Sequence, residues 1–267
     1  MKKRKNYIHT NSKTYRDFIA ARNKIIDSAA QGIEHYSERE AAGLPYPVKQ
    51  YLYSCGYIST PKANSMKAVF TDVEFLFTNK RRISIDYVQY NVVNKPARLA
   101  YIGSSIYGIP FEGLDSFVDG KASMKGILAG RLTIFNQRSQ AMNKAALFTY
   151  LAECFLNPNT ALQDFITWQD IDDRHVKATI SCHGESASSI FSLNKNGEMH
   201  SFETNDREAI AANGESKQVK WSAVCGEYKV TDGIRKPTKL QAVWHYDEGD
   251  VIYFDSENIS IETYPGI

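Results

Sequence analysis

One acidic side chain, Glu153, lies in the stretch 139–162, which is otherwise mainly apolar and has helical periodicity. On a helix, Glu153 projects away from the apolar stripe that contains Phe148 and Phe155. It therefore either faces water or pairs with a basic residue on a neighbouring strand. If a sheet encloses both sides of the helix, Glu153 points into a cavity and needs a partner, for which Arg207 is the candidate. Such a desolvated glutamate is able to serve as a general acid or base.

A second group of residues has the chemistry of a pocket for an apolar molecule with a few polar contacts. His200 and His245 lie in predicted strands beside aromatic residues, where a single histidine is either structural or catalytic. The tryptophans either pack in the core or line a cavity, and their polar tips need partners in both cases. The candidate ligand-binding residues are Tyr87, Gln89, Phe148, Glu153, Trp168, Arg207, Trp221, Tyr228, Trp244 and His245.

Motifs for cofactors and metals are missing. The chain has no Gly-x-Gly-x-x-Gly, no His-Glu-x-x-His and no Walker phosphate loop. The stretch 103–110 has the spacing of a phosphate loop, but Ile109-Pro110 replaces the lysine and hydroxyl residue that would contact phosphate and magnesium. The acidic stretch 170–173 lacks the glycine and distal glutamate of a calcium loop and is typical of a solvated turn. We expect no cofactor and no metal.

Composition narrows the classes of partner. With 267 residues, 43% hydrophobic residues and a net charge of +2, the chain is typical of a globular protein and shows no basic stripe for nucleic acid. The basic stretch 2–5 is either a solvated terminus or a weak contact to an anionic membrane surface. The sequence favours no oligomeric state.

The cysteines and the N-terminal residues indicate the cellular compartment in which we expect the protein. Cys55, Cys154, Cys182 and Cys225 are widely spaced, so we expect reduced and mostly buried thiols rather than a zinc site. We recognise no signal peptide and no stretch long enough to span a membrane. These features favour a cytoplasmic location.

Three helices and one short turn should position these residues. Periodicity predicts a helix from Thr14 to about Tyr36, a short turn from Ser37 to Ala42 with a Ser37–Glu40 capping box, and a helix over 48–54. The most apolar helix spans 139–156, with Ser139 as its N-cap and Pro158 preventing its continuation. We predict that this helix packs on a sheet.

The remaining chain alternates with a period of two and predicts roughly ten strands, mostly antiparallel. Turns are expected at Asp119-Gly120, Asn196-Gly197 and Asp232-Gly233. We expect an irregular connection over 103–113 and a single strand over 122–135. We divide the chain into an N-terminal helix and tail, 1–43, and one β-rich domain, 44–267.

Several spaced motifs together resemble an uncharacterised bacterial domain family of unknown function. They cover most of the chain and are Leu44-Pro45-x-Pro47-Val48-x-x-Tyr51-Leu52, Tyr150-Leu151-Ala152-Glu153 ahead of Pro158 and Ala161-Leu162, Trp168-x-x-Ile171-Asp172-Asp173, Asn196-Gly197-Glu198 ahead of Arg207, and Tyr228 ahead of Asp232-Gly233-Ile234 and Pro237-Thr238.

The architecture of this family resembles that of lipoprotein-localisation factors. The resemblance implies an α+β fold in which a large antiparallel sheet curls into a half-barrel, with helices packed in and over its concave face. Such relatives carry lipid or acyl chains, and at least one branch is an enzyme that acts on a small aromatic substrate. The family supplies no agreed catalytic residues.

Three functions follow. The first is binding of a hydrophobic or lipid-like small molecule in a cavity between the curled sheet and the central helix. The second is a cofactor-free enzyme, an isomerase, cyclase or hydrolase, that uses Glu153 in the same cavity with Arg207 or a strand histidine. The third is a partner-binding scaffold, which a large exposed apolar patch would favour.

Overall fold

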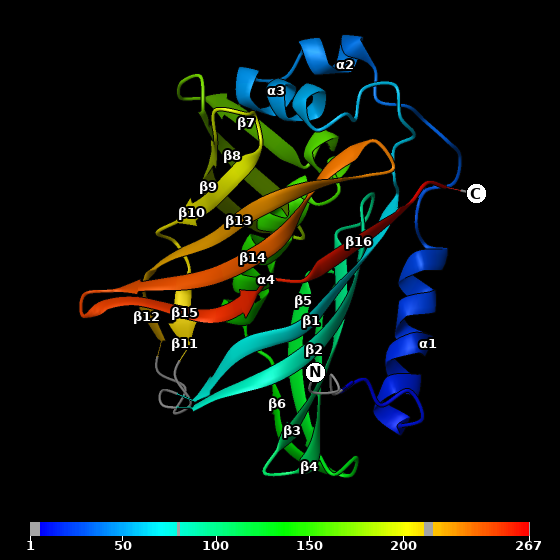
Figure 1. The fold of residues 1–267 in the computed structure, drawn as a ribbon, viewed down its shortest axis with the longest axis vertical. Helices are drawn as coiled ribbons and strands as arrows, with labels where there is room; N and C mark the ends of the chain where they lie inside the picture. The colour runs from blue at the N-terminus through cyan, green and yellow to red at the C-terminus, as the bar shows by residue number, and fades with distance from the viewer. Residues whose placement is uncertain (1–5, 79–80, 211–215, 267) are drawn as a thin grey trace.

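The fold is α+β and is dominated by one large antiparallel sheet (Figure 1). The computed structural model describes residues 6–78, 81–210 and 216–266. Within these residues the sheet has 14 strands, and a separate pair of short strands lies beside it. The predicted class and the large antiparallel sheet are therefore confirmed. The basic stretch 2–5 lies outside the described residues.

Short helices flank the sheet. Their bounds are α1 Lys13–Asp27, α2 Glu38–Ala42, α3 Tyr46–Ser54 and α4 Gln140–Ala152, with the 3₁₀ turns η1 Glu153–Phe155 and η2 Thr160–Leu162. The predicted capping box of α2 is present, because Ser37 accepts a hydrogen bond from the Glu40 N–H and the Glu40 carboxylate accepts one from the Ser37 N–H. In the part of the chain that the structure describes, no helix is both long and apolar enough to cross a bilayer.

The first predicted helix is too long. We expected it to reach Tyr36, but α1 ends at Asp27 and Gly32 adopts a left-handed backbone with φ of +96°. The periodicity that predicted this helix is a stripe of Phe18, Ile25, Ile26, Ala29 and Ile33, and Ile33 is 60% exposed. Only Phe18 and Ile25 of that stripe are buried, because just the first half of the segment packs on the sheet.

The central helix begins as predicted and ends earlier. The hydroxyl of Ser139 accepts a hydrogen bond from the Met142 N–H, which caps the first turn. The α-helix ends at Ala152 rather than at 156, since the chain tightens into η1 before Pro158. Glu153 is therefore the C-cap residue of α4 and not an interior residue of the helix.

Most strands pair antiparallel with the next strand along the chain, as in hairpins. Their bounds are β1 Ser65–Thr78, β2 Arg81–Val92, β3 Ala97–Ile106, β4 Ile109–Val118, β5 Lys121–Leu128, β6 Leu132–Gln137, β7 Ile166–Asp170, β8 His175–Cys182, β9 Glu185–Leu193, β10 Met199–Thr204, β11 Glu208–Ile210, β12 Ser216–Gln218, β13 Lys220–Thr231, β14 Ile234–Tyr246, β15 Gly249–Ser256 and β16 Ile259–Tyr264. The sheet order is β6-β5-β4-β3-β2-β1-β15-β14-β13-β10-β9-β8-β7, with β16 paired to β1, while β11 pairs with β12.

Two strand predictions need correction. The expected irregular connection over 103–113 is a hairpin, because Tyr107 and Gly108 have φ of 53° and 82° and let β3 and β4 pair up to the turn. The single strand expected over 122–135 is two strands, which separate at Ala129-Gly130. The predicted turns Asp119-Gly120 and Asp232-Gly233 connect β4 to β5 and β13 to β14.

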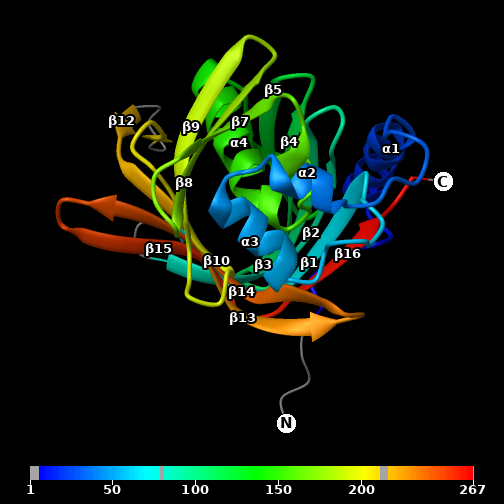
Figure 2. The same ribbon diagram turned by 90° about the horizontal axis from the view of Figure 1, so that it is seen from above.

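The helix α4 contacts strands that are far apart in the sheet order, β4 and β5 on one side and β9 on the other (Figure 2). The β4–β5 and β8–β9 turns also meet, because a Cβ atom placed on Gly120 would lie 2.4 Å from the Cβ atom of His183. We call the face of the sheet toward α4 the inner face. The other face of β2–β4 is covered by α1, which packs Phe18 and Ile25 on it.

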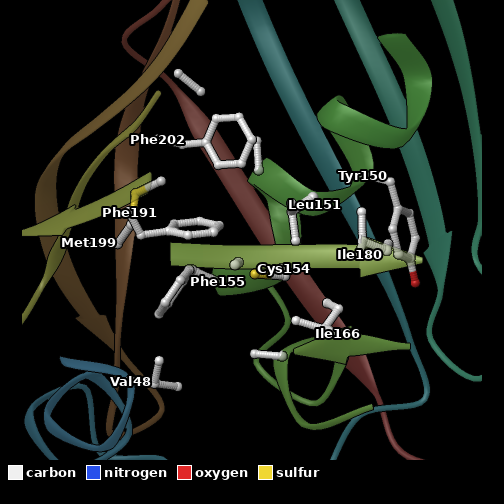
Figure 3. Close-up of a cluster of buried hydrophobic side chains, with 14 of the residues drawn as sticks. Val48, Tyr150, Leu151, Cys154, Phe155, Ile166, Ile180, Phe191, Met199 and Phe202 are labelled. Atoms are coloured by element: carbon white, nitrogen blue, oxygen red, sulfur yellow. The ribbon is translucent and has the colours of Figure 1, made fainter. Parts of the chain in front are cut away.

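The main core lies between α4 and the inner face (Figure 3). Phe155 is 2% exposed and its ring lies 4.6 Å from that of Tyr51 and 4.8 Å from that of Phe191. The predicted buried thiols are also confirmed, since Cys55, Cys154 and Cys225 are buried and free. Burial raises the pKa of Cys55 and of Cys225 to about 12, so neither thiol ionises near neutral pH.

Replacement of Phe155 by alanine tests this core. We expect the free energy of unfolding to fall by about 3–5 kcal/mol, because the substitution leaves a cavity among aromatic rings. Urea denaturation measures the loss. Leu132→Ala is the control, since Leu132 is 61% exposed on the edge strand β6 and should change stability by less than about 1 kcal/mol. Equal losses for the two variants would contradict a packed core at Phe155.

Candidate functional site

Glu153 points to the inner face, where β2 and β3 present polar side chains to it. Its Oε2 atom accepts hydrogen bonds from Gln89 Nε2 at 2.7 Å and from Asn91 Nδ2 at 2.8 Å. Both carboxylate oxygens lie 3.2 Å from Nε of Arg98. The Glu153 side chain is 11% exposed and that of Arg98 is 7% exposed, so this ion pair is largely removed from water.

Each of the three nitrogens of the Arg98 guanidinium donates to at least one acceptor. Besides Glu153, it donates through NH1 to Asp115 and through NH2 to Tyr87 and Gln89. Burial alone would lower the pKa of Arg98, but the negative charge of Glu153, supported by Tyr87 and Asp115, outweighs burial and raises it well above its usual value. Arg98 therefore stays charged and fully hydrogen-bonded inside the protein.

Strand register assembles this cluster. Tyr87, Gln89 and Asn91 alternate along β2 and so share the inner face. Arg98 lies directly opposite Asn91 on β3, and Asp115 on β4 lies opposite Ala100, two residues from Arg98. Glu153 then reaches the cluster from the end of α4. The cluster ties the end of α4 to three neighbouring strands.

The partner of Glu153 is Arg98 in place of Arg207, the partner that the sequence suggested. Arg207 lies just before β11, with its guanidinium carbon 4.0 Å from the centre of the Trp221 ring and 5.5 Å from that of Trp244. Within the described residues, its Nε and NH1 atoms are buried and have no hydrogen-bond acceptor. Burial lowers the pKa of Arg207.

The two tryptophans beside Arg207 are linked by Tyr253. The indole Nε1 of Trp221 donates to the Tyr253 hydroxyl at 3.1 Å, and the Tyr253 ring stacks on Trp244 at 6.1 Å between centroids. The structure therefore brings together Arg207, Trp221 and Trp244 from the predicted set, and separately Tyr87, Gln89 and Glu153.

Three predicted site residues pack in the main core or against it. Phe148 is fully buried, and Trp168 packs against Phe155 while its Nε1 donates to the Ala161 carbonyl at 2.9 Å. The Tyr228 hydroxyl donates to the Met199 carbonyl at 2.9 Å, and burial raises the pKa of Tyr228. The polar tips of Trp168 and Tyr228 donate to backbone carbonyls, as the core-packing alternative requires.

His245 belongs to a different constellation. Its Nε2 atom lies 2.8 Å from the Ser222 hydroxyl and its Nδ1 atom lies 2.7 Å from Asp250. Serine, histidine and carboxylate in this order can activate a nucleophile. However, Ser222 is only 2% exposed and pairs with Glu203 on one side and Val243 on the other, in a regular stretch of the ladder. This arrangement gives no accessible nucleophile and no strained turn to expose one.

Two surface hollows are lined mainly by polar and charged residues and contain none of the predicted ligand-binding residues. The larger, about 480 Å³, lies where α4 begins against β4 and β5 and is lined by Ser116, Lys121, Ala122, Ser123, Arg138, Ser139 and Asn143. The other, about 400 Å³, is lined by Arg174, His175, Ser192, Leu193, Asn194, Lys195 and His200. His200 thus lies at the surface and apart from Glu153.

The acidic stretch 170–173 forms the predicted turn, in which Asp172 accepts hydrogen bonds from the N–H groups of Arg174 and His175. No cluster of three or more histidine, cysteine or acidic side chains suited to a metal occurs within residues 6–78, 81–210 and 216–266.

The sequence did not identify Arg98, Asn91 or Asp115 as site residues. A signal for Arg98 was present in the sequence, because this charged residue shares the period-two alternation of the apolar Ala100 and Ile102 in what is now β3. A charge on an inward row requires a buried partner. The identity of the acidic partner could not be predicted, because it depends on strand register and on the residue at which α4 ends.

The family model described as a family of unknown function (DUF6544) matches residues 34–256. The match includes the motifs on which the predicted family resemblance rests, from Leu44-Pro45 to Pro237-Thr238, and confirms that resemblance. No curated protein matches the sequence.

Three solved structures are similar to this one and have little sequence identity with it. A LolA superfamily protein from Nitrosomonas europaea matches with a TM-score of 0.40 and 10% identity over 82% of this chain and 94% of that chain. A putative outer membrane lipoprotein-sorting protein domain from Vibrio parahaemolyticus matches with a TM-score of 0.38 and 10% identity over 75% and 84%. A DUF1329 family protein from Desulfovibrio piger matches with a TM-score of 0.40 and 11% identity over 88% and 95%.

Replacement of Arg98 by methionine tests the buried cluster. We expect a loss of about 3–5 kcal/mol in the free energy of unfolding, because Glu153 and Asp115 lose their cationic partner. Urea denaturation measures it, and Arg98→Met/Glu153→Leu should recover much of the loss. Arg82→Met is the control, since Arg82 pairs with Glu74 at the surface and should contribute less than about 1 kcal/mol. An Arg98 effect as small as that of Arg82 would contradict the cluster's structural role.

Proposed function

Because the chain belongs to DUF6544, a family of unknown function, we propose a function from the geometry of its inner face: it binds an amphipathic, lipid-like small molecule beside α4. The observation that carries this proposal is a row of aromatic side chains that crosses the inner face and is only partly covered by the protein itself.

The aromatic row comes from five strands. In one run, the ring centroids lie 6.4 Å apart for Phe135 and Phe111 and 5.7 Å for Phe111 and Phe77. In a second run, they lie 6.4 Å apart for Phe75 and Tyr253 and 6.1 Å for Tyr253 and Trp244. The two runs meet on β1, where Phe75 and Phe77 are two residues apart. Apart from Phe111, each of these side chains is half-buried. An apolar chain laid along the row would cover the area that remains exposed, at about 25 cal/mol per Å².

The proposal treats the sheet as a half-barrel curled around α4. Two observations support the curl: α4 contacts both β5 and β9, and the β4–β5 turn packs against the β8–β9 turn. Strands that lie far apart in the sheet order meet the same helix, which a flat sheet does not permit. A curved wall directs the aromatic row toward a shared interior.

The ligand does not occupy the space around Phe148, where the first expectation placed it. Phe148, Phe155 and Phe191 are fully or almost fully buried in the main core, so this part of the interior is filled by the protein itself. The half-buried row from Phe75 to Trp244 lies at the margin of that core. We therefore place the ligand at this margin.

The proposal includes no catalytic step. Each oxygen of Glu153 accepts at least one hydrogen bond from Arg98, and Oε2 also accepts from Gln89 and Asn91. Proton transfer through Glu153 would first have to break this buried ion pair. The cofactor-free enzyme expected from the sequence therefore has no specific observation in its favour.

Binding of the neutral fluorescent probe N-phenyl-1-naphthylamine tests the proposal. We expect saturable binding to the delipidated protein and an increase in probe fluorescence. Phe75→Ala and Trp244→Ala should each weaken binding about tenfold, which corresponds to ~1.4 kcal/mol of lost apolar contact.

Tyr46→Ala provides the matched control, because Tyr46 is an aromatic residue 51% exposed at the start of α3, outside the row. It should bind the probe as tightly as the natural protein does. Binding that does not saturate, or that Tyr46→Ala weakens as much as Phe75→Ala does, would count against the proposal.

A further inference from the structure

The inner face carries two buried arginines that differ in hydrogen bonding: one has an acceptor for each guanidinium nitrogen, and the other, within the described residues, does not. Arg98 donates to Glu153, Asp115, Tyr87 and Gln89 and has no donor nitrogen without an acceptor. Arg207 stacks on Trp221 and Trp244, and in the described part of the chain its Nε and NH1 atoms have no acceptor. Both of these nitrogens are shielded from water.

An unpaired, buried guanidinium is costly, because its N–H groups lose water without gaining an acceptor. Stacking on two indole rings compensates in part, since each ring face attracts a cation. This attraction uses the positive charge and no N–H donor, so Nε and NH1 remain without an acceptor in the described part of the chain. The arrangement thus orients the donors of Arg207 without using them.

The nearby acidic residues do not neutralise Arg207. Glu153 and Asp115 both form ion pairs with Arg98, at 3.2 Å and 2.5 Å. Within the described ranges, neither carboxylate forms a hydrogen bond or an ion pair with Arg207. The positive charge of Arg207 is therefore held close to the aromatic row with donors free for an external acceptor.

We propose that Arg207 binds the acidic head group, a carboxylate or phosphate, of an amphiphile whose apolar chain lies along the aromatic row. Arginine suits this role because its planar donors match the oxygen atoms of either group. Trp244 joins the two parts of the site, since it contacts the guanidinium of Arg207 and stacks on Tyr253 of the row. This inference rests on the proposed function and adds the charge of the ligand to it.

Competition against bound N-phenyl-1-naphthylamine tests the inference with the full chain. Dodecanoate, dodecyl phosphate and dodecanol share one apolar chain and differ in the head group. We expect at least one of the two acids to displace the probe at a concentration at least tenfold lower than dodecanol does. The tighter of the two acids identifies the head group.

Arg207→Met should remove this preference while dodecanol still displaces the probe at its original concentration, because methionine keeps the apolar contact with the indole rings. An unchanged far-ultraviolet circular dichroism spectrum establishes that the variant is folded. As a second readout, the acid should change the fluorescence of the tryptophans at a concentration about tenfold lower in the natural protein than in Arg207→Met.

Arg138→Met is the control, since Arg138 lines the polar hollow at the start of α4 and would be the receptor if the acid bound there. It should keep the preference for the acid. Equal displacement by acids and alcohol in the natural protein, or loss of the preference in Arg138→Met and not in Arg207→Met, would overturn the role of Arg207. Failure of the probe itself to bind would instead overturn the proposed function.

Discussion

The buried ion pair between Arg98 and Glu153 is the interaction on which this structure depends. A guanidinium that is 7% exposed requires acceptors, and it obtains them from β2, β4 and the first residue after α4. The pair therefore fixes the end of the helix to one part of the sheet. The first turn of α4, where Asn143 Oδ1 accepts from the Ala122 N–H, fixes its other end to β5.

A helix fixed at both ends divides the inner face into two parts. On one part, the side chains of α4 and η1 meet those of β8–β10 in a filled aromatic core around Phe155. On the other part, the aromatic side chains of the row other than Phe111 remain half-buried, and Arg207 has donors without an acceptor beside the row. A closely packed core and a region of half-buried aromatic side chains therefore lie next to each other on the inner face. This contrast, and not an enclosed cavity, supports the binding of an amphiphile.

Local signals predicted the local structure well. The capping box of α2, the cap at Ser139 and the turns at Asp119-Gly120 and Asp232-Gly233 each depend on residues within four positions of one another. The errors occurred where one local pattern was compatible with more than one structure. The first helix was predicted too long because the apolar residues beyond Asp27 do not pack on the sheet. The hairpin at Tyr107-Gly108 was missed because this pair is not a typical turn sequence. The partner of Glu153 depended on strand register across residues 89–115, which alternation alone does not encode.

The most direct test of the central claim is a crystal structure of the protein with dodecanoate bound. The account predicts the carboxylate within hydrogen-bond distance of the Arg207 guanidinium, with the alkyl chain against Trp244, Tyr253 and Phe75. An alkyl chain bound on the face that α1 covers, or a carboxylate at Arg138 with the aromatic row left uncovered, would contradict it.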